Sequence, residues 1–449
     1  MFNKSHFRAL VPCLLASASV LSACSASGGG NSSNTSDATN TAVTETATSN
    51  TTSSSSSTST TTTTLAASST DNPMVGQSPG VGAPDIPTTD HNVLDDLEPS
   101  WGTGAIPVSN APDYVGAFRF VCRHVTLSRD DPTVYPGQPG ASHLHDQTGV
   151  NGWNAYSNYG NLRTGGGGSG CNDVEAVDKD PSKATHAANR TPYWQPALLD
   201  GKGNVILPDY TVFYYKRRPS SDPIVNDPTN AKYQGQAVPL PNGIKFLFGA
   251  FPDNPSKTPD SQFSFNCVGA TNQPDQGNLT FAQAIQCAKD NYQYGAQMDV
   301  RGTAPDCWDG VNLDTPDHRS HLTYGTYGSW GYYKCDAAHP YVIPNFTYIA
   351  FYTILPSDTG DIHFSSDEMD NSKPRGWSFH VDYGPAAWDP QVLKMWTDNC
   401  INKLLNCSGG DLGNGLQLKG AEEPRYLING TWTASWHNPN RLVPLPPNG

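Results

Sequence analysis

The stretch GWSFHVDYGPAAWD, residues 376 to 389, carries the pattern on which the fold prediction rests. Apolar and polar side chains alternate from Trp377 to Asp382, and successive side chains on a β-strand point to opposite faces of the sheet. The stretch therefore predicts a half-buried strand with His380 and Asp382 on its polar face.

Other segments extend this pattern into a β-rich fold. Runs of aromatic and β-branched residues predict further strands at residues 210–215, 244–251, 263–268 and 346–355. Helices are predicted over residues 280–290 and from Asp389, as N-cap, through Pro390 at the first helical position. The chain holds 42 Gly, 37 Pro and 20 Tyr among its 449 residues, a composition typical of loop-rich β proteins. We therefore predict a mainly β fold, an antiparallel β-sandwich or jelly-roll, with a few helices.

The first 23 residues have the features of a bacterial export signal. Lys4 and Arg8 precede an apolar run, residues 9 to 21, that is too short to cross a bilayer as a permanent helix. The run ends in Leu-Ser-Ala-Cys, which resembles the lipobox of bacterial lipoproteins with Cys24 as the lipidated residue. An ordinary cleavage site beside an incidental cysteine is the alternative. The sequence predicts an exported lipoprotein of the bacterial outer membrane or cell surface, held to the membrane through its lipid anchor only.

Residues 24–112 are predicted to form a tether, and residues 113–449 a single folded domain. Up to about residue 70 the tether consists largely of Ser, Thr, Asn, Ala and Gly, which cannot bury enough apolar surface to fold, and a Pro- and Gly-rich lead-in follows. The formal charge of −14 and the scarcity of basic residues argue against nucleic acid as a partner. We expect a monomer whose partner is an extracellular polysaccharide or the cell wall.

Eight cysteines remain when Cys13 of the signal and Cys24 are set aside. An even number in an exported domain predicts four disulfides, which would staple the fold. Cys400 and Cys407 are the easiest pair to propose because they are close in the chain. The spacing lacks the paired C-x-x-C of zinc sites, so cysteine ligation is the weaker alternative.

Two histidine pairs are the next candidates for a site. In GASHLHDQTG, residues 140 to 149, an extended backbone would point His143 and His145 to the same side, as a metal or a substrate requires. In the loop CWDGVNLDTPDHRSHLTY, residues 307 to 324, His318 and His321 lie three apart beside Asp314 and Asp317. In a helical turn both rings would share one side, whereas in a loop the spacing promises nothing.

On the strand predicted at residues 377–382, Asp382 could orient the His380 ring and fix its tautomer, as general bases and metal ligands require. A polar face that only contacts water is the alternative for these two residues.

Taken together, these segments resemble a secreted family known as a domain of unknown function, number nineteen ninety-six, which is frequent in fungi and also found in bacteria. The resemblance covers about residues 117 to 405 and is carried by Val121-Cys122, Asp131 to Gly140, His143-Leu144-His145, Tyr193-Trp194-Gln195-Pro196, Cys307-Trp308-Asp309-Gly310, Asn312-Leu313-Asp314, His318, His321, His339-Pro340 and Phe379-His380-Val381-Asp382. The loops at 165–168 and 357–374 depart from the pattern, and nothing after Cys407 matches it. The family has no established reaction. The resemblance implies that histidines and aspartates from separate strands and loops meet in one cleft.

Three uses of these residues compete. The first is an enzyme that hydrolyses or eliminates on a polysaccharide, with His380, Asp382, His318 and Asp317 as catalytic residues. The second is a zinc- or copper-binding protein or metalloenzyme in which His143, His145 and His321 are ligands. The third is a non-catalytic glycan binder that stacks sugars on aromatic residues, although most of these aromatics are expected in the core: Trp153, Tyr156, Tyr159, Tyr193 and Trp194.

We take the polysaccharide enzyme as the leading hypothesis and the metal-binding protein as the close alternative. A structural calcium site in the Asp-rich loop 309–317 would be compatible with any of the three. If the histidine segments form one site, at least three of the five candidate rings should converge, with Asp382 supporting His380.

Overall fold

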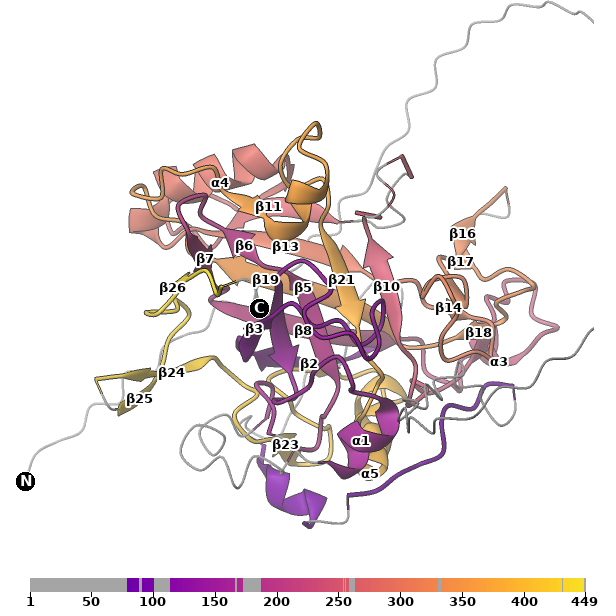
Figure 1. Ribbon diagram of the computed structural model, residues 1–449. Helices are drawn as coiled ribbons and strands as arrows, with labels where there is room; N and C mark the ends of the chain where they lie inside the picture. Colours follow the sequence, from indigo (N-terminus) through magenta and orange to yellow (C-terminus); the bar gives the residue numbers. More distant parts are fainter. Residues whose placement is uncertain are drawn as a thin grey trace, which may run out of the picture. The chain divides into compact units, whose positions relative to one another are not determined.

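The computed structural model describes residues 79–88, 91–100, 114–165, 168–172, 187–252, 254, 256–257, 263–329, 333–429 and 431–447. The predicted signal peptide, the lipidation site at Cys24 and most of the predicted tether lie outside these ranges. The folded part is shown in Figure 1.

A five-stranded antiparallel sheet carries the stretch that decided the fold prediction. Its strands run in the order β10 (Phe246–Gly249), β21 (His380–Tyr383), β5 (Pro192–Pro196), β4 (His145–Gly149) and β3 (Thr126–Ser128). Four consecutive β21 residues are buried, because neighbouring structure covers the polar face as well as the apolar one. The alternation in the sequence thus correctly predicts the strand. The prediction that the strand is half-buried is wrong, because all four residues are buried.

A seven-stranded sheet forms the second layer. Its strands run in the order β12 (Gln276–Leu279), β11 (Ser264–Val268), β13 (Gln297–Thr303), β19 (Asn345–Tyr352), β8 (Tyr210–Arg217), β2 (Gly116–Cys122) and β22 (Asn406–Cys407). All neighbours are antiparallel except β2 and β22. The long central strands are visible side by side in Figure 1.

The two sheets pack face to face through aromatic side chains. Tyr193 of β5 stacks on Phe213 of β8 with ring centroids 4.3 Å apart. Gln195, also on β5, donates from its Nε2 to the hydroxyl of Tyr352 on β19, at 2.5 Å. Because residues 193 and 195 face the second sheet, the alternating residue Trp194 must face the opposite way. The architecture is an antiparallel β-sandwich, so the predicted fold class is confirmed.

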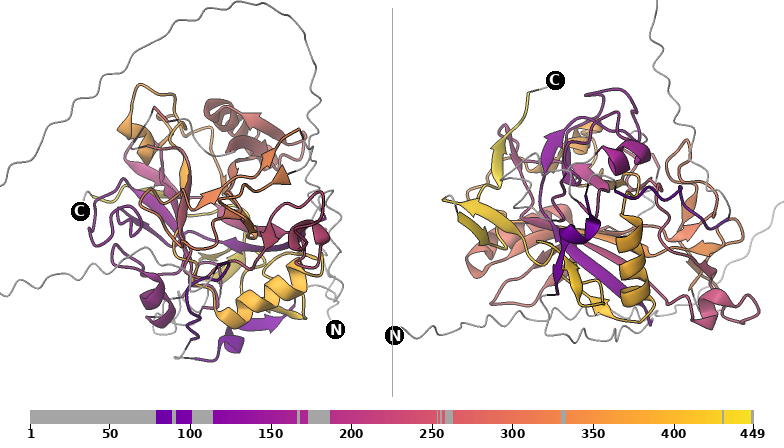
Figure 2. Two further views of the ribbon diagram at one scale, coloured as in Figure 1. Left: turned by 90° about the vertical axis from the view of Figure 1, so that its right-hand side faces the viewer. Right: turned by 90° about the horizontal axis from the view of Figure 1, so that it is seen from below.

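The helices are few and short, as expected. The α-helices are α1 (Tyr159–Thr164), α3 (Pro223–Asn226), α4 (Phe281–Asp290) and α5 (Pro390–Trp396), and α5 continues into the π-helical turn η5 (Thr397–Ile401). The side chain of Asp389 caps α5 by accepting from the Gln391 N–H, at 2.9 Å. Trp396 then stacks on Phe118 of β2 at 5.3 Å, so α5 closes one end of the core beside β2 (Figure 2).

Smaller elements complete the described chain. The short 3₁₀ segments are η1 (Val93–Asp96), η3 (Tyr292–Tyr294) and η4 (Ser365–Met369). One four-stranded sheet has the order β15 (Leu322–Thr323), β14 (Cys307–Trp308), β18 (Tyr341–Val342) and β9 (Gln236–Ala237). A second has the order β20 (His363–Phe364), β6 (Leu198–Leu199), β7 (Asn204–Ile206) and β26 (Leu442–Pro444). Three further sheets are strand pairs: β1 (Leu97–Pro99) with β23 (Leu416–Leu418), β16 (Thr326–Tyr327) with β17 (Tyr333–Lys334), and β24 (Arg425–Ile428) with β25 (Thr431–Ala434).

Part of the predicted lead-in belongs to this fold. Ala83, Val93 and Leu97 are buried in the main hydrophobic core. β1 pairs with β23 near the end of the described chain. These apolar residues are sparse among prolines and glycines, which is why composition alone grouped them with the tether.

Four disulfides staple the domain, as the even cysteine count predicted. They join Cys122 to Cys171, Cys267 to Cys287, Cys307 to Cys335 and Cys400 to Cys407. Such a set indicates an extracellular or secreted protein. Within the described part of the chain, no helix combines the length and apolar character needed to span a bilayer.

Candidate metal centre

Strand register brings two of the candidate histidines to one face of the five-stranded sheet. His145 on β4 pairs with Pro196 on β5, and on the other side of β5 Asp382 pairs with Trp194. Continuing that register places His380 level with Pro196. Residues opposite one another in a sheet share a face, so His145 and His380 flank β5 on the face that points away from the second sheet.

His143 completes a cluster of three imidazoles. It precedes β4 in the loop that connects β3 to β4, so the predicted H-x-H strand is only half formed. Its ring centroid lies 4.2 Å from that of His145 and 5.2 Å from that of His380. One nitrogen from each of the three rings lies within 4.8 Å of the others. Three of the five candidate rings therefore converge.

The hydrogen bonds of two rings fix where their protons sit. His380 Nδ1 lies 2.8 Å from the carbonyl oxygen of Ser378, so Nδ1 carries the proton. The Ser365 hydroxyl donates to the Leu144 carbonyl at 2.5 Å, which leaves its oxygen free to accept from His143 Nδ1 at 3.0 Å. In both neutral rings Nε2 is then unprotonated and carries a lone pair. The two Nε2 atoms lie 3.3 Å apart.

Burial keeps these rings neutral. His145 and His380 are fully or almost fully buried, and His143 is half-buried. Desolvation lowers the pKa of His380 to about 4, helped by the positive charge of Arg319 and opposed by the Ser378 hydrogen bond. Burial, followed by the neighbouring imidazoles, lowers the pKa of His143 and of His145 well below the usual value. Neutral imidazole is the form that binds metals.

The His145 ring has fewer hydrogen bonds than the other two rings. Both of its nitrogens are buried and lack a hydrogen-bond partner of good geometry in the described structure. The Asp130 backbone lies close enough to raise the pKa of the ring slightly against the larger effect of burial. A buried ring without a bonded partner is unfavourable unless a ligand supplies the missing interaction.

Asp382 lies on the Nε2 side of the His380 ring and not on the Nδ1 side. Its Oδ2 is 3.5 Å from His380 Nε2, whereas the ring is oriented through Nδ1 by Ser378. The orienting role expected for Asp382 is thus performed by a backbone carbonyl. Desolvation raises the pKa of Asp382 well above the usual value, the nearby charge of Asp131 adds to this, and Arg319 opposes it.

His318 and His321 lie outside the cluster. His318 Nδ1 pairs with Asp314 at 2.7 Å, and the other oxygen of Asp314 pairs with Lys245 at 3.1 Å. His321 Nδ1 lies 3.0 Å from the Thr315 hydroxyl, and burial lowers the pKa of His321 to about 4. Their loop is bonded to the edge of the sheet, where the Leu247 N–H donates to the His318 carbonyl at 2.9 Å, but neither ring belongs to the three-histidine group.

The aspartates of loop 309–317 are bonded to their own turns. Asp309 accepts from the N–H groups of Val311 and Asn312, at 2.8 and 2.9 Å. Asp317 accepts from the Ser320 N–H at 2.9 Å, and such bonds lower its pKa despite its partial burial. Among the residues that the structure describes, the three histidines form a group able to hold a metal, and these aspartates do not join it.

Most of the candidate sugar-stacking aromatics are core residues, as expected. Trp153, Tyr159, Tyr193 and Trp194 are buried, and Trp153 packs on Trp194 with ring centroids 4.5 Å apart. Tyr156 is the exception, with 62 % of its surface exposed.

Sequence reasoning did not find the residues that hold the rings in place. Ser378 was placed on the polar face of the strand, but it acts through its carbonyl oxygen, which no side-chain pattern reveals. Ser365 lies far along the chain in a loop that departs from the family pattern. Arg319, whose charge lowers the pKa of His380 and of Asp382, lies between the two loop histidines in the sequence and has no pattern that predicts this effect.

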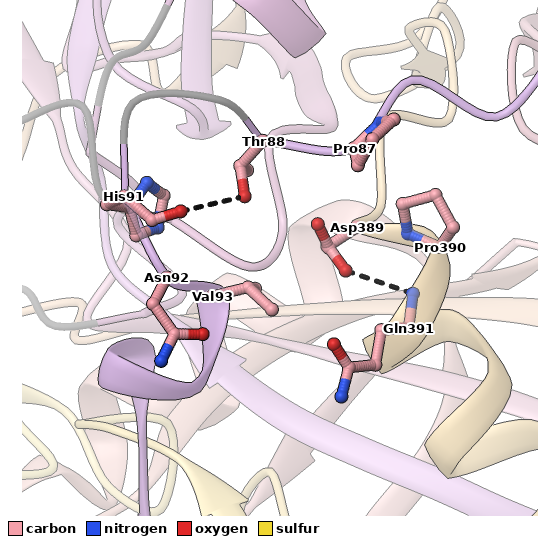
Figure 3. A pocket seen from close by; sticks show the side chains of 8 residues that line it. All are labelled: Pro87, Thr88, His91, Asn92, Val93, Asp389, Pro390 and Gln391. Atoms are coloured by element: carbon pink, nitrogen blue, oxygen red, sulfur yellow. Dashed lines mark hydrogen bonds between the residues drawn. The ribbon is translucent and has the colours of Figure 1, made fainter.

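A separate pocket lies at the start of α5. Figure 3 shows it between two groups of residues, Pro87 and Thr88 with His91 to Val93 on one side and the turn Asp389–Gln391 on the other. The predicted site residues are not among those that line it. Its one capping hydrogen bond, from Gln391 N–H to Asp389, serves the helix.

The comparisons with known proteins agree with the resemblance read from the motifs. Residues 131–388 match the model of the family described as Domain of unknown function (DUF1996). No curated protein and no solved structure matches the chain. The chain belongs to the DUF1996 family, and the matched segment contains all three histidines of the cluster.

Proposed function

We propose that this domain is an extracellular metalloprotein that binds zinc through His143, His145 and His380. The observation that carries the proposal is the pair of Nε2 lone pairs facing each other at 3.3 Å. Without a cation between them, two such lone pairs repel. A neutral His143 with its proton on Nε2 would bridge them, but its Nδ1 would then need the Ser365 hydroxyl hydrogen, which is donated to the Leu144 carbonyl at 2.5 Å. A shared proton in addition to both Nδ1 protons would charge a buried ring, and burial opposes that charge.

The spacing of the two nitrogens fits zinc geometry. Ligand nitrogens bound at about 2.0–2.1 Å in a tetrahedral arrangement lie roughly 3.3 Å apart, which matches the distance between His143 and His380. Adjacent nitrogens of a square-planar copper(II) site would lie nearer, at about 2.8 Å. The hydrogen bonds to Ser378 and Ser365 are the outer contacts that metal-binding histidines characteristically make. Zinc therefore takes precedence over copper.

Zinc binding is measurable on the full chain with its disulfides intact. After removal of metals with a chelator, the protein should take up about one zinc per chain, as read by elemental analysis, and should retain it in competition with calcium. Copper(II) in a parallel titration decides the identity of the metal. Retention of no transition metal after equilibration with excess zinc would refute the proposal.

A polysaccharide substrate, predicted from the sequence, remains part of this proposal. Three protein ligands leave one tetrahedral position open, as in zinc enzymes that activate water, which favours a hydrolase over a storage site. Burial of four of the five candidate aromatics speaks against the non-catalytic glycan binder. Soluble products released from a panel of plant and microbial glycans by zinc-loaded protein, and not by metal-free protein, would identify the substrate.

Surface attachment through Cys24 also remains a proposal. Cys24→Ser should leave the protein unprocessed or release it from the membrane fraction, because the thiol is the atom that would be lipidated. Membrane fractionation and the mass of the N-terminal peptide test this. Unchanged processing and fractionation in the variant would remove the lipoprotein assignment and leave a freely secreted protein.

A further inference from the structure

The Asp382 carboxyl group has no internal use in the described structure. Both oxygens are buried and neither has a hydrogen-bond partner there. A buried, unbonded carboxyl group destabilises a fold. Its position on β21 is fixed by pairing on both sides, with Leu247 and with Trp194, so the side chain cannot turn away from this face.

The carboxyl group lies near the proposed metal position. Oδ2 lies 3.5 Å from His380 Nε2, and a zinc on that nitrogen would add about 2.0–2.1 Å. The separation between Oδ2 and the metal is therefore at most roughly 5.5 Å. A water at about 2.1 Å from zinc that donates a hydrogen bond of about 2.7 Å to the carboxyl group spans up to roughly 4.8 Å, within that limit.

Direct ligation by Asp382 does not fit the same geometry. The group whose ligand atoms all lie within 4.8 Å of one another contains the three histidines and not Asp382. A fourth tetrahedral ligand would lie about 3.3 Å from each of the others. A water molecule between the metal and the Asp382 carboxyl group would fit this longer separation.

Further unpaired polar groups lie on the same rung of the sheet. Trp194 pairs with Asp382 on one side and with Gln147 on the other. The Trp194 Nε1 and both amide atoms of Gln147 are buried without a hydrogen-bond partner among the described residues. Hydrogen-bonding groups without partners thus lie on the same rung as Asp382, on the face of the sheet that carries His145 and His380.

We propose that Asp382 is a positioning residue that holds a water molecule on the fourth coordination position of the zinc. This proposal rests on the proposed zinc site and extends it, because it makes the centre water-activating and hydrolytic instead of a closed structural zinc.

Two substitutions of Asp382 test the role in the full chain. Asp382→Leu removes the unbonded carboxyl group at similar volume, so the melting temperature of the metal-free protein should rise while zinc affinity falls by about 10- to 100-fold. Asp382→Asn keeps a group that can hydrogen-bond a water, and its zinc affinity should stay within about threefold of the wild type. Asp209→Asn is the matched control, since Asp209 is a buried carboxylate fully bonded to Gln297, Thr353 and Asn438. It should lower the melting temperature and leave zinc affinity unchanged.

Cobalt substitution gives a readout that a structural role would not alter. The visible spectrum of the cobalt-loaded protein reports the fourth ligand, and its pH-dependent change should shift in Asp382→Leu while remaining in Asp209→Asn. Zinc affinity and cobalt spectrum both unchanged in Asp382→Leu would overturn this proposal while the zinc site itself stands. A wild type that binds neither metal would instead refute the proposed function.

Discussion

Replacing His380 by alanine should weaken zinc binding by about a thousandfold or more, roughly 4 kcal/mol. The substitution removes one of the three proposed ligand atoms, the Nε2 that faces His143 Nε2 at 3.3 Å. The remaining two imidazoles cannot define a tetrahedral site by themselves. Calorimetric titration of the metal-stripped full chain measures the loss directly.

His318→Ala is the matched control for this experiment. His318 belongs to the same set of family histidines but pairs with Asp314 outside the cluster. Its removal should leave zinc affinity within about threefold, although it breaks the hydrogen bond to Asp314 and costs about 1 kcal/mol of stability. Equal loss of zinc in both variants would place the site elsewhere or spread it over both segments.

Stability measurements separate a missing ligand from a damaged fold. Saturating zinc should raise the melting temperature of the wild type, since a ligand at about a hundredfold above its Kd adds roughly 2.7 kcal/mol, and this increase should vanish in His380→Ala. The metal-free variant should differ from metal-free wild type by only about 1 kcal/mol. Should His380→Ala fail to fold, His143→Ala provides the same test from a half-buried loop position.

The sequence contained the strand pattern of the site but not its geometry. Alternation around His380 predicted a strand and placed Asp382 on the same face, because the period of a strand is a local property. The approach of His145 depends on β5 lying between β4 and β21 in a particular register. That pairing joins segments far apart in the chain, and no local period encodes it.

The loop histidines show the opposite limit. The family resemblance includes His318 and His321, so both are expected in the cluster. A sequence motif, however, does not determine the direction in which a side chain points. His318 adopts a positive φ of 54°, a conformation rare for residues with side chains. It turns the ring towards Asp314 in its own loop. Turn geometry of this kind arises from Asp317 and its hydrogen bonds, which a spacing of three cannot predict.

The disulfides were easier to foresee than the site because they need only a count and a compartment. Eight cysteines in an exported domain gave four pairs, and proximity identified Cys400 with Cys407. The other three pairs span 20 to 49 residues and follow from the fold. The same argument explains why a count of histidines was less informative: a histidine can serve as a ligand, an ion-pair partner or a core residue.

Acidification should destabilise the metal-free protein between about pH 6.5 and pH 4, with His380 as one identifiable cause. In the unfolded chain this imidazole binds a proton near its usual pKa of 6.5, whereas burial lowers the pKa to about 4 in the folded state. Over that window the unfolded state binds more protons, so the free energy of unfolding falls as the pH falls. The interval corresponds to about 3 kcal/mol for a single fully buried group. His143 and His145 act in the same direction, because burial lowers their pKa values as well.

The contribution of His380 is isolated by comparing pH slopes rather than single values. The raised pKa of Asp382 acts in the opposite direction, because its buried carboxyl group takes up a proton in the folded state more readily than in the unfolded chain. Denaturant unfolding of metal-free wild type and His380→Ala at a series of pH values cancels this shared term. Between about pH 6.5 and pH 4 the free energy of unfolding should fall less steeply in the variant than in the wild type. The difference between the two slopes should correspond to at most one bound proton. Identical slopes would mean that the folded protein binds this proton as readily as the unfolded chain, so that burial does not lower the pKa of His380. The comparison therefore tests, without any metal present, whether the His380 ring is desolvated in the folded protein.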